Sequence, residues 1–540
     1  MAPLLSVKNL SIQFPSRAGV VRAVENVSWH VDPGETLAIL GESGSGKSVS
    51  ASAVMNLIET PPAAISQGEI LFEGLDLLKA DDETRRRING RSISMIFQDP
   101  LAALNPVYSI GWQIAETMRV HGTPGDQAQA RVVELLARVG IAEPERRMKD
   151  YPHQFSGGQR QRIMIASAIA LKPKLLIADE PTSALDVTVQ ARVLELLKEI
   201  QTENGMGMVL ITHDLSVVER VADRVVVMQA GQIVETGSAA QVMNDPRHSY
   251  TRRLLDAVPG RKGFATAADD AGGTPLLEVR NVSKVYGGLA RQFSKLKTAP
   301  VKAVDNVSFT MAKGETLGVV GESGSGKSTL ARMILALDEP SSGTIHFDGQ
   351  PFNGLTGAED YRMRRRVQFV FQDPTASLNP RMTVQQIIAE PWAIHPDVLP
   401  RGQWRAQVGE LLEQVGLKPD HADRYPHQFS GGQRQRIAIA RALALKPELI
   451  VCDEAVSALD VSIQAQVIDL LKDLRRDYGL SYVFVAHDLA LIRDFATSVL
   501  VMYQGRIVEQ GPVAQVYDHP QHDYTKALLR AGATLPVQAA

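Results

Sequence analysis

The chain has little of several features that would narrow its class. Its 540 residues include one cysteine, Cys452, which excludes a disulfide framework and a zinc or iron–sulfur site built from the chain's own cysteines. Apolar residues flank Cys452, so we interpret it as a small buried side chain. No run of about 18 apolar residues is present, so no segment is typical of a membrane-spanning helix. The start lacks a basic and apolar leader, and we expect a cytoplasmic protein.

A strong charge of one sign is also absent. The formal net charge is −3 at pH 7, and 44% of the residues are hydrophobic. This composition is typical of a soluble globular protein and provides no basic field of the kind that nucleic-acid binding needs. The length leaves room for two domains of about 260 residues, each able to bury a large core.

What is present is a repeat. The segment GESGSGKS occurs twice, and each copy is followed at similar spacing by FQDP, FSGGQRQR and a strand ending in Asp-Glu. A period this long indicates two whole domains rather than a solenoid. Between the copies lies a stretch rich in small, glycine and polar residues, which is typical of an exposed linker. We predict one domain at 1–258, a linker at 259–275 and a second domain at 276–540.

The repeated segment fits the phosphate-loop pattern G-x-x-x-x-G-K-[ST]. Backbone N–H groups of such a loop wrap phosphates, the lysine neutralises them, and the last hydroxyl reaches Mg²⁺. Apolar runs lead in as strands and helix-forming residues follow, so a helix N-terminus faces the anion. We therefore predict two nucleotide sites. Their loop residues, each with one following residue, are Gly41, Glu42, Ser43, Gly44, Ser45, Gly46, Lys47, Ser48, Val49 and Gly321, Glu322, Ser323, Gly324, Ser325, Gly326, Lys327, Ser328, Thr329.

The segment FSGGQRQR, placed between the phosphate loop and the Asp-Glu strand, resembles the signature of ABC-transporter ATPase domains. The resemblance covers nearly the whole chain, twice. It implies an α/β fold of two tandem P-loop ABC ATPase domains. Each would have a RecA-like α/β core, an antiparallel β subdomain and a helical subdomain that carries the signature. The expected cofactors are ATP and Mg²⁺.

The chemistry of the signature suits an anion. Its serine offers a hydroxyl, its glycines expose backbone N–H groups, and it lies where a helix begins. In the family this segment meets the γ-phosphate of ATP held by the opposite domain. The resemblance thus pairs loop 41–48 with the second signature, and loop 321–328 with the first. The signature residues are Ser156, Gly157, Gly158, Gln159 and Ser430, Gly431, Gly432, Gln433.

Phosphoryl transfer to water needs a metal, a positioned water and fixed positive charge. By resemblance, Ser48, Ser328, Asp179 and Asp453 lie at Mg²⁺, and Gln98 and Gln372 touch metal and water. The catalytic carboxylates are Glu180 and Glu454, which polarise the attacking water. His213 and His487 match the switch histidine that contacts the γ-phosphate. Asp186 and Asp460 end SALD segments that match the loop crossing the domain interface.

One aromatic residue follows the first strand motif of each copy. Phe14 and Tyr286 lie where the family stacks a ring on the adenine base, and stacking is indifferent to the base's hydrogen-bond pattern. The alternative hypothesis is a core aromatic on an early strand.

The copies are not identical. Thr329 follows the second loop, whereas Val49 follows the first, and the second copy has Ala455 and Val456 where the first has Pro181 and Thr182. Neither change removes a catalytic group. We predict two hydrolytic sites with different nucleotide affinity.

The ends of the copies point to what hydrolysis drives. Both carry H-x-Y-T-x-x-LL, at 248–255 and 522–529. These tails resemble those of ATPases in dipeptide, oligopeptide and glutathione importers, here fused in one chain. The resemblance implies a peripheral protein at the cytoplasmic face of the bacterial inner membrane. Its partners would be two integral-membrane permease subunits and, indirectly, an extracytoplasmic peptide-binding protein. We interpret the tail histidine and tyrosine as part of a capped, packed helix rather than a metal site.

Three alternative functions involve related ATPases. An importer of the same family for nickel, opines or sugars fits the same motifs. A soluble tandem ATPase acting on ribosomes would join its domains by a long charged helical linker, which the stretch at 259–275 is not. A DNA-repair ATPase of the superfamily would carry zinc-binding cysteines, and the single cysteine excludes it.

Overall fold

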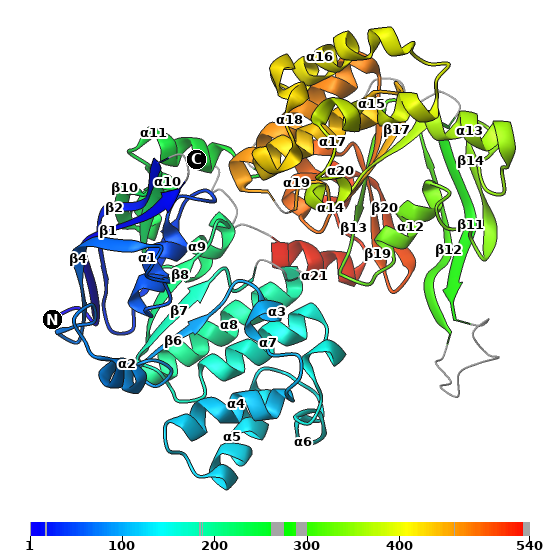
Figure 1. Ribbon diagram of the computed structural model, residues 1–540. Coiled ribbons are helices and arrows are strands. Elements are labelled where there is room, and N and C mark those ends of the chain that lie inside the picture. Colours follow the sequence, from blue (N-terminus) through cyan, green and yellow to red (C-terminus); the bar gives the residue numbers. More distant parts are fainter. Residues whose placement is uncertain are drawn as a thin grey trace. The chain divides into compact units, whose positions relative to one another are not determined.

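The computed structural model describes residues 2–16, 19–182, 185, 187–260, 275–287, 300–457 and 459–532. It divides into Met1–Ala257 and Val258–Ala540, hereafter the first and second half (Figure 1). Most of the stretch at 259–275 lies outside the described residues, as does the insertion after Tyr286.

The centre of the first half is a six-stranded sheet in the order β10-β9-β3-β8-β7-β6. Five strands are parallel, and only β10 runs antiparallel to its neighbour. Every residue of β3, β6, β7 and β8 is buried, because helices cover both faces of a parallel sheet. The strands are β3 (Thr36–Leu40), β6 (Ile93–Ile96), β7 (Leu175–Asp179), β8 (Gly207–Ile211), β9 (Arg224–Gln229) and β10 (Gln232–Ser238).

A second, antiparallel sheet has the order β2-β1-β4-β5. It comprises β1 (Leu5–Ser16), β2 (Gly19–Val31), β4 (Ala64–Phe72) and β5 (Leu75–Asp76). One hydrophobic cluster contains Leu5 and Leu10 from this sheet, Ile39 from the six-stranded sheet and Val54 from helix α1. The two sheets thus share a core with the helix that follows the phosphate loop.

Helices fill the remainder of the first half. In Figure 1, α4 and α5 stand together on the side away from β1 and β4, with α7 between them and the sheet. A second cluster joins Ile110 and Leu135 from this lobe to Ile163 of α7 and Leu176 of β7. The helices are α1 (Lys47–Val54), α2 (Asp82–Ile88), α3 (Pro100–Ala103), α4 (Ile110–Val120), α5 (Gly125–Arg138), α6 (Pro144–Arg147), η1 (Pro152–Gln154), α7 (Gly157–Ala168), α8 (Val187–Asn204), α9 (Leu215–Val221), α10 (Ala239–Asn244) and α11 (Ser249–Asp256).

The second half repeats this plan, with sheets β12-β11-β14-β15 and β16-β17-β18-β13-β19-β20. Its strands are β11 (Leu277–Tyr286), β12 (Val301–Met311), β13 (Thr316–Val320), β14 (Ser342–Phe347), β15 (Gln350–Pro351), β16 (Val367–Val370), β17 (Leu449–Asp453), β18 (Ser481–Val485), β19 (Ser498–Tyr503) and β20 (Arg506–Pro512). Cys452 lies on the interior strand β17 and is fully buried, as predicted, and burial raises the pKa of its thiol.

Helices of the second half follow in the same order. They are α12 (Lys327–Ile334), α13 (Gly357–Arg366), α14 (Pro374–Ser377), α15 (Val384–Ile394), η3 (Arg401–Gln403), α16 (Trp404–Gln414), η4 (Pro419–Asp423), η5 (Pro426–Gln428), α17 (Gly431–Leu443), α18 (Val461–Tyr478), α19 (Leu489–Phe495), α20 (Val513–Asp518) and α21 (Asp523–Gly532). Each half therefore has an α/β core, an antiparallel subdomain and a helical subdomain. The predicted fold class is confirmed.

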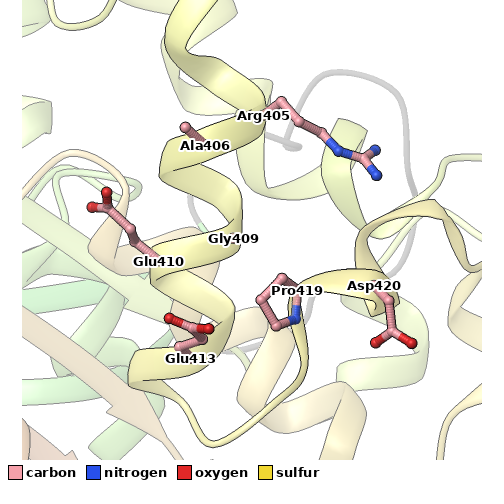
Figure 2. Close-up of a pocket in the computed structure, with 7 residues that line it drawn as sticks. All are labelled: Arg405, Ala406, Gly409, Glu410, Glu413, Pro419 and Asp420. Carbon is pink, nitrogen blue, oxygen red and sulfur yellow. The ribbon is translucent and has the colours of Figure 1, made fainter.

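A pocket of about 440 Å³ lies between α16 and η4 on the helical subdomain of the second half (Figure 2). Three carboxylates line it, from Glu410, Glu413 and Asp420. Its one cation, Arg405, already donates to Asp423 at 2.6 Å. No residue predicted for the nucleotide sites lines this pocket, so it is separate from them.

Candidate nucleotide sites

Each phosphate loop joins the carboxyl end of a buried strand to a helix. The first runs from β3 to α1, and the second from β13 to α12. In both, the residue capping the helix is a left-handed glycine, Gly46 at φ 98° and Gly326 at φ 103°. A Cβ on Gly46 would also lie 2.3 Å from the Ala23 carbonyl oxygen. The loop's shape therefore requires glycine here for two reasons, backbone angle and space.

The loop lysines are buried although they carry charge. Lys47 is 6% exposed, and its Nζ donates to the carbonyl oxygens of Gly41 and Glu42 at 2.8 Å each. Lys327 makes the same two bonds, to Gly321 and Glu322 at 2.7 and 2.9 Å. The loop thus folds around its own ammonium group, which places a fixed positive charge inside the anion cradle.

One hydroxyl in each loop has no hydrogen-bond partner among the described residues. Ser45 Oγ and Ser325 Oγ are buried, and each lies beside the first glycine of its loop. A buried polar group without a partner costs free energy. Both loops therefore keep an unsatisfied donor at the place where a phosphate group is expected.

A hydroxyl and a carboxylate meet at the end of each loop. Ser48 Oγ donates to Asp179 Oδ1 at 3.0 Å, and Ser328 Oγ donates to Asp453 Oδ1 at 3.2 Å. Burial is the largest influence on both aspartates and raises their pKa despite the serine hydrogen bonds. Within the described ranges, no group of three or more His, Cys, Asp or Glu side chains forms a metal site. The hydroxyl–carboxylate pair still fits Mg²⁺, which takes few protein oxygens and several from phosphates.

The glutamate after each of these strands adopts an unusual backbone conformation. Glu180 has φ 46° and Glu454 has φ 47°, in the left-handed region that disfavours a side chain. Their N–H groups donate to the carbonyls of Ile211 and Val485, which holds the turn. Residues kept in such a conformation are concentrated at functional sites. No sequence pattern predicts this conformation.

In the first half, two predicted residues come together on the glutamate. Gln98 Nε2 donates to Glu180 Oε2 at 2.8 Å, and His213 Nδ1 lies 3.0 Å from Glu180 Oε1. Burial raises the pKa of Glu180, but the hydrogen bond and charge of His213 together with Lys47 outweigh burial, and the net pKa is lowered. The carboxylate is thus held ionised between two side chains from neighbouring strand ends.

The second half assembles the same residues less tightly. Gln372 Nε2 donates to Glu454 Oε2 at 2.6 Å. His487 Nδ1, however, lies 4.0 Å from Glu454 Oε1, beyond hydrogen-bonding distance. The histidine is therefore the point at which the two sets of groups differ.

Both signature segments start a helix. Ser156 and Ser430 are the N-caps of α7 and α17, and Gln159 and Gln433 complete reciprocal capping boxes. Gly432 packs closely on α18, since a Cβ there would lie 2.2 Å from Ile463 Cγ2. The segment thus presents a well-ordered helix N-terminus, as the sequence predicts.

The predicted adenine aromatics differ in their surroundings. Phe14 is half-buried and packs against the core cluster of its half, as Val49 does. Tyr286 is exposed, and its hydroxyl donates at 3.0 Å to Asp338, which also accepts from Arg332 of the phosphate-loop helix α12 at 2.9 Å. Base stacking remains a prediction for both. The tyrosine is tied to the phosphate-loop helix, whereas the phenylalanine is part of the core.

Two predicted residues follow the glutamates. Asp460 is the N-cap of α18. Asp186 lies outside the described residues. Nothing in the described geometry bears on their predicted role.

The family model of ABC transporters matches residues 24–183 and 304–457, more than half of the chain, so the chain belongs to the ABC transporter family. It is a nucleotide-binding ATPase with two cassettes in tandem. A second model, the C-terminal region of oligopeptide/dipeptide transporters, matches 234–282 and 508–538, where the repeated tails lie.

Curated relatives match almost end to end. The chain is 49% identical to the peptidoglycan transport ATP-binding protein YejF of Agrobacterium fabrum, over 98% of this chain and 96% of that protein. It is 48% identical to the glutathione import ATP-binding protein GsiA of Salmonella typhimurium and 46% identical to GsiA of Escherichia coli K12, each over 98% of this chain and 89% of the relative.

A solved ATP-binding cassette, in a dimeric post-hydrolysis state with ADP and phosphate, is 31% identical over 44% of this chain and 98% of its own, with a TM-score of 0.39. In the part of the chain that the structure describes, no helix has the length and apolar character needed to cross a bilayer.

Sequence reasoning missed one pair of residues beside the loops. Tyr250 and Tyr524, from the tails, place their hydroxyl groups on the backbone of the phosphate loops. Their equal position in the H-x-Y-T-x-x-LL repeat was the available signal.

Proposed function

We propose that the chain is the ATP-hydrolysing subunit that energises import of peptides through a membrane ABC transporter. The observation that carries the proposal is the combination, in each half, of a full set of hydrolysis groups with a tail matched by the oligopeptide/dipeptide transporter model. The relatives that it matches over 98% of its length are named for transport of glutathione and of peptidoglycan. Glutathione is a tripeptide and peptidoglycan carries peptide stems, so peptides are the common chemistry.

The geometry supports a definite division of labour. Loop N–H groups with Lys47 and Lys327 hold the phosphates. Glu180 and Glu454, each already accepting a hydrogen bond from a glutamine, orient and polarise the attacking water. His213 and His487 steady that water and the γ-phosphate. Bound at the serine–aspartate pairs, Mg²⁺ would neutralise charge on the phosphates.

Pairing of the halves completes each site in this proposal. The signature of one half, a capped helix N-terminus, would meet the γ-phosphate held by the loop of the other half. ATP then clamps the halves together, and hydrolysis releases them. That cycle would drive two integral-membrane permease subunits at the cytoplasmic face of the inner membrane, supplied by an extracytoplasmic peptide-binding protein.

The first test of this proposal identifies the proteins that bind the chain in native membranes. The Glu180→Gln/Glu454→Gln double variant, which binds ATP without hydrolysing it, is purified with ATP from detergent-solubilised native membranes beside the wild-type chain. We expect two polytopic permeases to co-purify, with greater recovery for the double variant. Ribosomal proteins without a permease would overturn the proposal in favour of a translation ATPase.

The substrate class is tested by reconstitution. The chain, the co-purified permeases and their binding protein are placed in proteoliposomes, and ATP turnover is measured with dipeptides, oligopeptides, glutathione, nickel chelates and opines. We expect peptides to stimulate turnover. Stimulation by nickel or opines alone would retain the importer and replace its substrate class.

A further inference from the structure

The tail of each half ends beside its own phosphate loop. Tyr250 of α11 is 3% exposed, and its phenolic oxygen accepts a hydrogen bond from the Glu42 N–H at 3.1 Å. In the second half, Tyr524 of α21 accepts from the Glu322 N–H at 2.9 Å. These residues are more than 200 positions apart in the sequence, so the contact is made by the fold, twice, at the same loop position.

A set of local hydrogen bonds fixes where each tyrosine points. Glu235, on β10, accepts from the N–H groups of Arg247 and His248 at 2.7 and 3.0 Å. His248 Nδ1 in turn accepts from the Tyr250 N–H at 3.2 Å. The histidine and tyrosine of the repeated tail therefore form one turn, anchored on the Glu235 carboxylate.

The second half builds the turn from the matching residues. Glu509 on β20 accepts from the N–H groups of Gln521 and His522, at 2.8 and 3.0 Å. His522 Nδ1 accepts from the Tyr524 N–H at 3.1 Å. The tail motif thus has a physical meaning: the polar residues set the turn, and the tyrosine reaches out of it to the loop.

Glu42, whose N–H is directed to the Tyr250 phenol, is held by hydrogen bonds at both its N–H and its carbonyl group. The Glu42 carbonyl accepts from Lys47 Nζ and from the Ser45 N–H, while its N–H is directed to the phenol. The entry of the loop is thereby anchored before any phosphate arrives. An anion cradle whose backbone is already ordered binds more tightly, since binding need not order it.

We infer that Tyr250 and Tyr524 are positioning residues for ATP binding. The hydroxyl of each tyrosine accepts a hydrogen bond from the phosphate loop of its own half, from the Glu42 or the Glu322 N–H, and so holds that loop in the phosphate-binding conformation. The inference rests on the proposed nucleotide sites. It assigns the tails a task in ATP binding rather than in contact with a permease or a metal.

The second half offers a matched control for the test. Tyr517 on α20, seven residues before Tyr524, donates its hydroxyl to the Leu489 carbonyl at 2.6 Å and does not touch the loop through that bond. Tyr517→Phe and Tyr524→Phe each remove one phenolic hydroxyl and keep the ring. Both are made in the full chain with Lys47→Ala, which leaves the second loop as the ATP site under study.

Two quantities are measured. The first is the Kd for ATP, and we expect Tyr524→Phe to raise it by about two- to tenfold, as for one lost hydrogen bond. The second is amide hydrogen exchange of the Glu322 N–H without nucleotide, and we expect it to accelerate by a similar factor. Tyr517→Phe should change neither. A general loss of stability would lower the melting temperature without singling out this amide.

The outcomes separate the two claims. If the Lys47→Ala parent binds no ATP, the second nucleotide site itself fails. If the parent binds ATP and Tyr524→Phe matches it in both Kd and exchange, the positioning role is wrong. Equal effects of Tyr517→Phe and Tyr524→Phe would also overturn it. The same comparison in the first half uses Tyr250→Phe with Lys327→Ala.

Discussion

In the first half His213 Nδ1 lies 3.0 Å from Glu180 Oε1, whereas in the second half His487 Nδ1 lies 4.0 Å from Glu454 Oε1. The glutamine on the other side of each carboxylate is in place in both halves. Around this glutamate the two halves thus share strand ends and residue types and differ in the histidine contact. This teaches that a duplicated set of catalytic residues does not by itself make two equal sites, because small changes around them alter how the groups meet.

The loops show a second difference. Thr329 offers a hydroxyl after the second loop, whereas Val49, after the first, packs against the hydrophobic core. The tails add a third, since Tyr524 is tilted against the ring of Tyr503 with centroids 4.2 Å apart, and the first half has Gln229 in the place of Tyr503. Nucleotide affinity is therefore expected to differ between halves more than the chemistry does.

The largest expected effect is on the glutamates. Glu180→Gln and Glu454→Gln, made separately, should each lower steady-state ATP turnover of the full chain by about 10²-fold. Each removes the group that polarises water, and in the proposed cycle ATP left unhydrolysed at one site keeps the halves clamped and stalls the other site. Phosphate release at saturating ATP measures this. Glu73→Gln is a suitable control, since Glu73 also has positive φ but pairs with Lys174 on the surface. Near-wild-type turnover in either variant would show that its half does not contribute.

The histidines test the contact that differs. His213→Ala should lower turnover by about 10- to 100-fold, and His487→Ala by less, because only His213 already bonds the carboxylate. Turnover is measured as for the glutamates, and ATP affinity is measured in parallel to separate binding from chemistry. Equal losses would mean that His487 closes on Glu454 when ATP binds, and the difference between halves would vanish during catalysis.

Exchange of one loop residue tests the difference in affinity. Val49→Thr should tighten ATP binding at the first site by about two- to tenfold, because it adds a hydroxyl where the second half has one. Thr329→Val should weaken binding at the second site by a similar factor. A fluorescent ATP analogue, titrated against chains in which the other loop lysine is alanine, gives each Kd. Unchanged affinities would place the cause of any asymmetry elsewhere.

The smallest effect concerns a feature that both halves share. Burial raises the pKa of Glu235 and Glu509, but hydrogen bonds from the tail outweigh it, and both pKa values are lowered. Each carboxylate therefore stabilises the fold above its unfolded pKa, and this stability is lost as pH falls through the folded pKa. Glu235→Gln and Glu509→Gln should each cost about 1 kcal/mol at pH 7, or about 2–4 °C in Tm.

Thermal unfolding between pH 7 and pH 3 checks this last prediction. The difference in Tm between wild type and either variant should shrink on the acid side, as the wild-type carboxylate becomes protonated. A difference that stays constant with pH would mean that the glutamate acts through its shape rather than its charge. The halves should behave alike, because the contacts of Glu235 and Glu509 are the same.

Much of this arrangement could be predicted from the order of residues. Buried parallel strands read as short apolar runs, and loops such as GESGSGKS have one dominant geometry, so β3, α1 and the positions of Lys47 and Asp179 follow from local patterns. Motifs at strand ends of one sheet converge, which is why Gln98, Glu180 and His213 meet as expected.

The remainder depends on packing at a distance. The contact of Tyr250 with Glu42 joins residues that no local pattern relates. The spacing of His487 from Glu454 results from small shifts of surrounding side chains, and the left-handed φ of Glu180 and Glu454 follows from the turn that their N–H groups make. Sequence patterns predict which residues lie in the site but not the distances between their side chains.

The backbone angle of those two glutamates bears on how this protein can be improved. A left-handed conformation costs a residue with a side chain about 1 kcal/mol, and glycine is spared that cost. A laboratory selection for heat resistance alone would therefore favour glycine at positions 180 and 454. The selected chains would have higher thermal stability, and under the proposed mechanism they would no longer hydrolyse ATP. A selection meant to raise the thermal stability of this ATPase must therefore also select for ATP turnover, or must leave positions 180 and 454 unchanged.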